Sequence, residues 1–135
     1  MIQFFFENID TVEIQSTTET WLEKIITSEG KKMGDINYIF CDDEYLLKIN
    51  QDHLKHDYYT DIITFDYVKG KTISADIFVS LPRILDNTEM FSKDFDRELN
   101  RVLAHGILHL CGFKDKTPDE ILIMRAKEDF YLAIF

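Results

Sequence analysis

The stretch RELNRVLAHGILHLCGFKD, Arg97 to Asp115, decides the fold of this chain because it carries a wide apolar helical face. Its apolar residues recur at the three- and four-residue spacing of an amphipathic α-helix: Leu99, Val102, Leu103, Ile107, Leu108 and Leu110. The helix is expected to begin around Ser92 to Asp94 and to stop at Gly112. We therefore predict that it is the central helix of the domain.

The end of this helix has the residues of a metal site. His105 and His109 are four residues apart, so their imidazoles share one helix face and can reach one ion. Gly112 can end the helix in a left-handed conformation and turn the chain back, which would bring Asp115 beneath the imidazoles. Three protein ligands leave a position for water, as in a catalytic zinc site. We therefore predict one Zn²⁺ bound by His105, His109 and Asp115, with that water as the reactive group.

Simpler interpretations of the same residues remain open. Paired histidines on a helix are often surface residues or hydrogen-bonded core residues. Asp115 could instead cap the turn before the last helix. Cys111 is expected to be a small buried thiol rather than a further ligand.

Short strands and helices alternate along the rest of the chain. We predict strands at residues 2–6, 36–41, 61–67 and 72–80, and helices at 17–30, 42–54 and from 117 onward. The last two strands form a hairpin around Gly70, and the last helix opens with a capping box, TPDE. The pattern indicates one α+β domain over residues 1–135, with a mixed sheet of about four strands packed with helices and the metal site at the end of the central helix.

Composition limits the classes of function. The 135 residues carry a formal net charge of -10, which argues against a generic nucleic-acid binder, although a local basic groove remains possible. The densest basic cluster is His53, Lys55 and His56. No apolar run reaches the length of a membrane span and two cysteines are too few for a disulfide framework, so we expect a cytoplasmic protein without membrane contacts.

The spacing of the site also matches that of metzincin proteases, HExxHxxGxxH. Their general base is the glutamate after the first histidine, and Gly106 stands there in this chain. A small zinc metallopeptidase is therefore disfavoured unless another carboxylate, such as Glu98 or Asp61, takes that role.

HGILHLCGFKD is similar to the signature HGxLHLxGYDH of the YbeY family, metal-dependent endoribonucleases of ribosomal RNA maturation and ribosome quality control. TDIITF at 60–65 resembles that family's TDVLSF, and ADIFVS at 75–80 resembles its GDI-containing strand. The resemblance implies a zinc-dependent, single-strand-specific endoribonuclease acting in 16S rRNA 3′-end maturation, with ribosomal RNA precursor and the ribosome or its associated proteins as partners. A non-catalytic, metal-stabilised ribosome-binding module remains a third hypothesis.

Two residues depart from the family pattern. Asp115 replaces the usual third histidine, and its negative charge should lower the net positive charge of the ion. Leu54 stands where many members carry an arginine that could contact RNA. The simpler interpretation is a buried leucine at a helix end.

Other side chains would then have to contact RNA or support the site. Lys55, His56 and Lys71 are candidates for phosphate contact, although each is also an ordinary surface residue type. Glu98 lies two turns before His105 and either supports the ligands or is a plain surface carboxylate. Asp61 either supports the site or starts a strand, and we favour the strand start.

Overall fold

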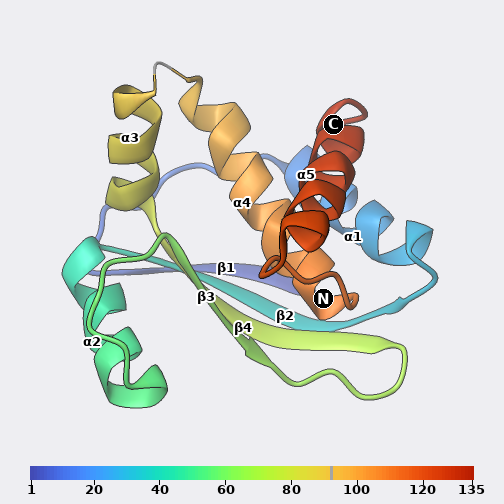
Figure 1. Cartoon of the computed structure of the whole chain (residues 1–135), viewed down its shortest axis with the longest axis horizontal. Coiled ribbons are helices and arrows are strands. Elements are labelled where there is room, and N and C mark those ends of the chain that lie inside the picture. The colour runs from blue at the N-terminus through green and yellow to red at the C-terminus, as the bar shows by residue number, and fades with distance from the viewer. Residues whose placement is uncertain (92) are drawn as a thin grey trace.

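A computed structural model describes residues 1–91 and 93–135 (Figure 1). The strands are β1 (Ile2–Glu7), β2 (Lys32–Cys41), β3 (Ile62–Asp66) and β4 (Thr72–Ser80). The helices are α1 (Ser16–Ser28), α2 (Asp43–Leu54), α3 (Leu81–Met90), α4 (Phe95–Leu110) and α5 (Pro118–Leu132). The predicted α+β class and four-stranded sheet are confirmed.

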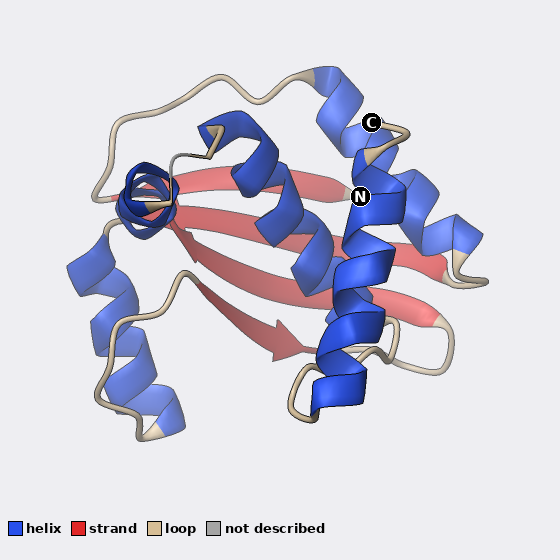
Figure 2. Cartoon of the chain, turned by 45° about the horizontal axis from the view of Figure 1, so that its top comes forward, coloured by secondary structure: helices blue, strands red, loops and turns tan. Residues whose placement is uncertain are grey.

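The strands form one mixed sheet in the order β1-β2-β4-β3. β1 pairs with β2 and β2 with β4 in parallel, while β3 and β4 form the predicted antiparallel hairpin (Figure 2). β2 is longer than predicted because the register shifts between Met33 and Ile36. The irregularity falls at Gly34 and Asp35, which lie inside the strand but outside the predicted range.

One face of the sheet carries the main core and the helix α4. Alternate residues of β4 point toward this core: Ile73, Ala75, Ile77 and Val79. The Tyr38 hydroxyl donates to the carbonyl of Leu103 at 2.7 Å, so the sheet is also bonded to α4 by a buried polar contact. Figure 1 shows α4 between α3 and α5, with α1 behind, and α4 contacts all three helices. The prediction of a central helix is confirmed.

The other face is covered only in part, by α2. Cys41, Leu46 and Ile63 form a smaller buried cluster there. α2 ends at Leu54, and the C-cap residue Lys55 has a left-handed backbone at φ 59°. The chain then runs through 55–61 to β3, so the segment after α2 reaches the edge of the sheet beside α4 (Figure 2).

Helix boundaries follow local capping. α4 begins at Phe95, and the side chain of its N-cap residue Asp94 accepts a hydrogen bond from the Arg97 amide. The earlier predicted start at Ser92 lies outside the described residues. α3 was not predicted. It starts because Ser80 caps the Arg83 amide and Pro82 occupies the first turn.

The last helix has the predicted capping box between Thr117 and Glu120. Among the residues that the structure describes, every helix is too short or too polar to span a bilayer.

Candidate metal centre

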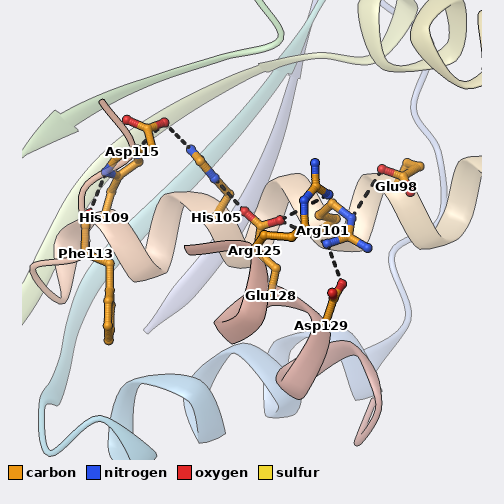
Figure 3. Close-up of polar contacts among 9 residues, drawn as sticks. All are labelled: Glu98, Arg101, His105, His109, Phe113, Asp115, Arg125, Glu128 and Asp129. Atoms are coloured by element: carbon orange, nitrogen blue, oxygen red, sulfur yellow. Dashed lines mark hydrogen bonds and ion pairs between the residues drawn. The ribbon is translucent and has the colours of Figure 1, made fainter. Parts of the chain in front are cut away.

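The last turn of α4 and the turn after it place the three predicted ligands together. Gly112 has φ 110°, a left-handed conformation that favours glycine, and the Phe113 amide donates back to the Leu108 carbonyl at 3.0 Å. The chain therefore reverses directly after the helix and returns beneath the face that carries His105 and His109 (Figure 3).

The Asp115 carboxylate faces both imidazoles. Its Oδ2 atom lies 3.3 Å from His105 Nε2 and 3.2 Å from His109 Nε2. Neighbouring ligands of a tetrahedral ion with bonds of about 2.0–2.1 Å are about 3.3–3.4 Å apart, so these separations suit one shared ion. The three residues form a His/His/Asp group that can hold a metal.

The second nitrogen of each imidazole is occupied by an acceptor. His105 Nδ1 lies 2.7 Å from Glu128 Oε2, and His109 Nδ1 lies 2.9 Å from the carbonyl of Phe113 (Figure 3). A carboxylate or carbonyl oxygen accepts, so each Nδ1 carries the proton. In the neutral imidazoles each Nε2 therefore carries the lone pair on the side of Asp115, as metal binding requires.

Glu128 is itself held by charged neighbours. It is buried, with only 4% of its surface exposed, and its Oε1 accepts from Arg101 Nη1 at 3.0 Å. The same Arg101 atom lies 2.9 Å from Asp129, and Arg101 Nε faces Glu98 at 3.4 Å. A chain of charged side chains thus runs from Glu98 through Arg101 and Glu128 to His105 (Figure 3).

These contacts change the pKa values of the groups. Burial works to lower the pKa of His105, but the hydrogen bond and charge of Glu128, together with Asp115, outweigh it and raise the pKa. Burial works to raise the pKa of Glu128, but its bonds to His105 and Arg101 lower it overall. Both changes favour the charged forms, so Glu128 and a protonated His105 attract each other.

Sequence analysis did not identify Glu128. A usable signal existed: Met124, Glu128 and Tyr131 stand at helical spacing, and the two others are buried core residues. A carboxylate on an otherwise apolar helix face needs a buried cationic partner or a donor. The sequence did not indicate that the partners would be His105 and Arg101 on another helix.

Gly106 lies on the face of α4 that is turned toward the sheet. A Cβ atom placed there would come within 3.1 Å of Ile62 Cδ1 and 3.4 Å of Ile77 Cδ1, so this residue lets α4 pack closely on the sheet. A side chain at position 106 would enter the core rather than the metal site. The metzincin arrangement of a base directly after the first histidine is therefore disfavoured here, because a side chain at position 106 would crowd Ile62 and Ile77.

Two hollows open beside the ligands. The first, of about 370 Å³, is named the α5 hollow; it is lined by Asp61, Ile62, Glu98, Arg101, Val102, His105, Asp115, Ile121, Met124, Arg125 and Glu128. The second, of about 660 Å³, is named the β3 hollow; it is lined by Asn50, Leu54, His56, Tyr58, Thr60, Asp61, Ile62, Ile63, Thr64, Asp66, His105, His109, Leu110, Asp115 and Lys116. Because they share His105 and Asp115, they meet at the metal centre.

The predicted phosphate contacts are only partly near the site. His56 lines the β3 hollow, whereas Lys55 and Lys71 line neither hollow. Lys55 Nζ is directed back to the Asp52 carbonyl at 3.5 Å. Leu54 is 40% exposed and forms part of the wall of the β3 hollow, so its interpretation as a buried helix-end leucine is wrong.

The candidate supporting groups lie on the other side. Glu98 lines the α5 hollow and pairs with Arg101, and so reaches His105 only through Arg101 and Glu128. Asp61 directly precedes β3, close to the expected strand start, but it also lines both hollows, and burial raises the pKa of its carboxyl group. Burial likewise raises the pKa of the Cys111 thiol to about 11, and Cys111 is not part of the ligand group.

Comparison with known proteins relates the whole chain to one family. The family model described as Endoribonuclease YbeY matches residues 3–135. A relative named Endoribonuclease YbeY from Flavobacterium johnsoniae is 53% identical over 135 residues, covering 100% of this chain and 97% of the relative. One of the same name from Christiangramia forsetii is 52% identical over 134 residues, covering 99% and 94%.

A solved structure has the same fold. The solution structure of TM1509 from Thermotoga maritima aligns with a TM-score of 0.68 and 29% identity. The alignment covers 98% of this chain and 87% of that protein.

Proposed function

The chain belongs to the endoribonuclease YbeY family of hydrolytic nucleases, and from that premise we propose that it is a zinc-dependent endoribonuclease specific for single-stranded RNA. Its proposed substrate is ribosomal RNA precursor, cleaved in 16S rRNA 3′-end maturation and in ribosome quality control. It would act in the cytoplasm, in contact with the ribosome or ribosome-associated proteins.

The convergence of His105, His109 and Asp115 beside two open hollows carries this proposal. Two imidazole nitrogens and one carboxylate oxygen are ligand types that zinc accepts, and three protein ligands leave a place for a reacting group. All three side chains are partly exposed, between 22% and 37%, so a substrate phosphate can approach them.

Each group at the site would have a separate role in the reaction. Zinc, when bound, would supply Lewis acidity toward a phosphoryl oxygen and toward water. Glu128 holds the proton of His105 on Nδ1, and the Phe113 carbonyl does the same for His109, so both Nε2 atoms stay available.

Asp61 is suited to proton transfer. Among the described residues it takes part in no ion pair, and it lines both hollows where they meet. Its carboxylate can therefore accept a proton from an attacking water.

Single-stranded RNA fits this site better than a duplex. The ligands are recessed between two hollows, and an unpaired strand can bend to bring one phosphate to them, whereas an A-form duplex presents a stiff, regular backbone. The peptidase alternative is weakened because Gly106 supplies no general base and a side chain there would be directed toward Ile62 and Ile77 of the sheet.

The test is a substrate panel with metal-stripped and zinc-reloaded protein. We expect the reloaded protein to cleave single-stranded RNA, to leave duplex RNA and peptides intact, and to lose activity again with chelator. Cleavage at the 3′ end of a 16S rRNA precursor would support the ribosomal substrate. Peptide hydrolysis, or zinc binding without cleavage of any RNA, would contradict the proposal.

A further inference from the structure

The two hollows form one path through the metal centre. They share Asp61, Ile62, His105 and Asp115, so a strand lying in one continues into the other past the ligands. A polymer cleaved in its interior needs such an arrangement, because chain extends on both sides of the scissile bond. The residues that line only one of the two hollows therefore determine which part of the RNA strand binds there.

Two arginines line the α5 hollow, and only Arg125 is available to a ligand. The Arg101 side chain is 13% exposed and lies within 3.4 Å of Glu98, Glu128 and Asp129. The Arg125 side chain is 53% exposed, and its ion pair with Glu128 is long, at 3.6 Å. Glu128 Oε1 already accepts the shorter bond from Arg101, so the Arg125 guanidinium keeps donors for an incoming anion.

The β3 hollow offers an aromatic surface instead. Tyr58 is 56% exposed and stacks on His56, with ring centroids 5.2 Å apart and ring planes 20° from parallel. The Tyr58 hydroxyl also lies 3.0 Å from His56 Nδ1, which orients the pair. Asn50 Nδ2 donates to the Tyr58 carbonyl at 2.9 Å, so the backbone that carries this ring is bonded to the end of α2.

We propose that a single RNA strand crosses the metal centre with a backbone phosphate bound by Arg125 in the α5 hollow and a nucleobase stacked on Tyr58 in the β3 hollow. This proposal rests on the proposed function and adds to it the path of the substrate. Guanidinium groups bind phosphate oxygens bidentately, and every base has a face that stacks on an aromatic ring. Arg125 thereby supplies, from α5, positive charge that Leu54 does not supply from α2.

Arg125→Ala tests the phosphate contact. Binding of a short labelled single-stranded RNA to zinc-saturated protein is measured by fluorescence anisotropy over a series of salt concentrations. We expect affinity to fall about tenfold and the slope of log affinity against log salt to become shallower by about 0.7, the value for one lost phosphate contact on a single strand. Arg125→Lys should retain most of the slope.

Lys48→Ala is the matched control. Lys48 is exposed on α2 and lines neither hollow, so this variant removes the same charge without touching the path. Zinc content and thermal melting are checked in every variant, because Arg125 also contacts Glu128. An unchanged salt slope in Arg125→Ala, or equal effects of Arg125→Ala and Lys48→Ala, would overturn the phosphate contact.

Tyr58→Leu and Tyr58→Phe test the base contact. Leucine removes the ring and should weaken binding about tenfold without changing the salt slope, whereas phenylalanine keeps the ring and should bind like the unmodified chain. Equal binding by both variants would overturn the stacking. If the zinc-loaded, unmodified chain binds RNA along this path but cleaves none, the proposed function fails while the path stands.

Discussion

The two histidines of the candidate metal centre are supported by different kinds of group. On the α5 side, His105 is held by Glu128, whose carboxylate is held in turn by Arg101. On the side of the turn after α4, His109 is held by the backbone carbonyl of Phe113. One ligand therefore depends on a network of charged side chains from two helices, and the other on the conformation of a single turn.

This difference predicts which change would remove the hydrogen-bond acceptor of each histidine. A side-chain network is broken by changing a charge, which leaves its remaining members buried and imperfectly paired. A backbone acceptor cannot be removed by substituting the residue that carries it, but it moves when the turn changes conformation. Four predictions separate the two kinds of support.

The largest effect is expected from removing both histidines. His105→Ala combined with His109→Ala should abolish stoichiometric zinc, because a single carboxylate remains of the ligand group. In the unmodified chain, zinc at a hundred times its Kd should stabilise the fold by about 2.7 kcal/mol, and this gain should vanish in the variant. Metal analysis and thermal melting with and without zinc measure both; His53→Ala, on α2, is the control. Retained stoichiometric zinc would refute the ligand assignment.

The next effect tests the α5 side. Glu128→Gln keeps an acceptor for His105 but removes the charge that orients it, and we expect zinc affinity to fall about 10- to 100-fold. Asp129→Asn is the matched control, since Asp129 pairs with the same Arg101 but does not contact His105. Competition with a chromophoric chelator measures the affinities. Equal losses in the two variants would mean that general charge, and not the bond to His105, matters.

A smaller effect tests the turn. Gly112→Ala forces a side chain into a left-handed backbone at φ 110° and should cost about 1–2 kcal/mol of unfolding free energy. It should also weaken zinc binding, because the Phe113 carbonyl and Asp115 both follow this residue. Gly30→Ala is the control. Gly30 follows α1 with φ 76°, so alanine there imposes similar strain far from the metal site in the sequence and should leave zinc affinity unchanged. Denaturant unfolding and zinc titration distinguish the two variants.

The smallest effect concerns the start of α5. Thr117→Ala removes the side chain that caps the Glu120 amide and should cost about 1 kcal/mol. Because the ligand group ends at Asp115 and Glu128 lies far along α5, zinc affinity should change little. A loss of affinity as large as that of Glu128→Gln would show that the cap, rather than the charged network, positions α5.

Much of the fold was predictable because its signals are local. The apolar spacing of α4, the capping box of α5 and the hairpin of β3 and β4 each depend on residues close together in the sequence. α3 has local start signals as well, the Ser80 cap and a proline in the first turn, but they directly follow a strand and the helix was not predicted. The length of β2 was missed because its first residues pair with β4 across an irregular register.

The amino-acid sequence by itself determined the candidate ligand group, because a helix places His105 and His109 on one face and a left-handed Gly112 brings Asp115 to the same face. Only the tertiary structure decided that Glu128 supports His105, that Gly106 faces the sheet and that Leu54 lines a hollow. These contacts join α2, α4, α5 and the sheet. The physical reason is that ligand spacing is set by the geometry of one helix and one turn, whereas supporting contacts depend on how separate elements pack.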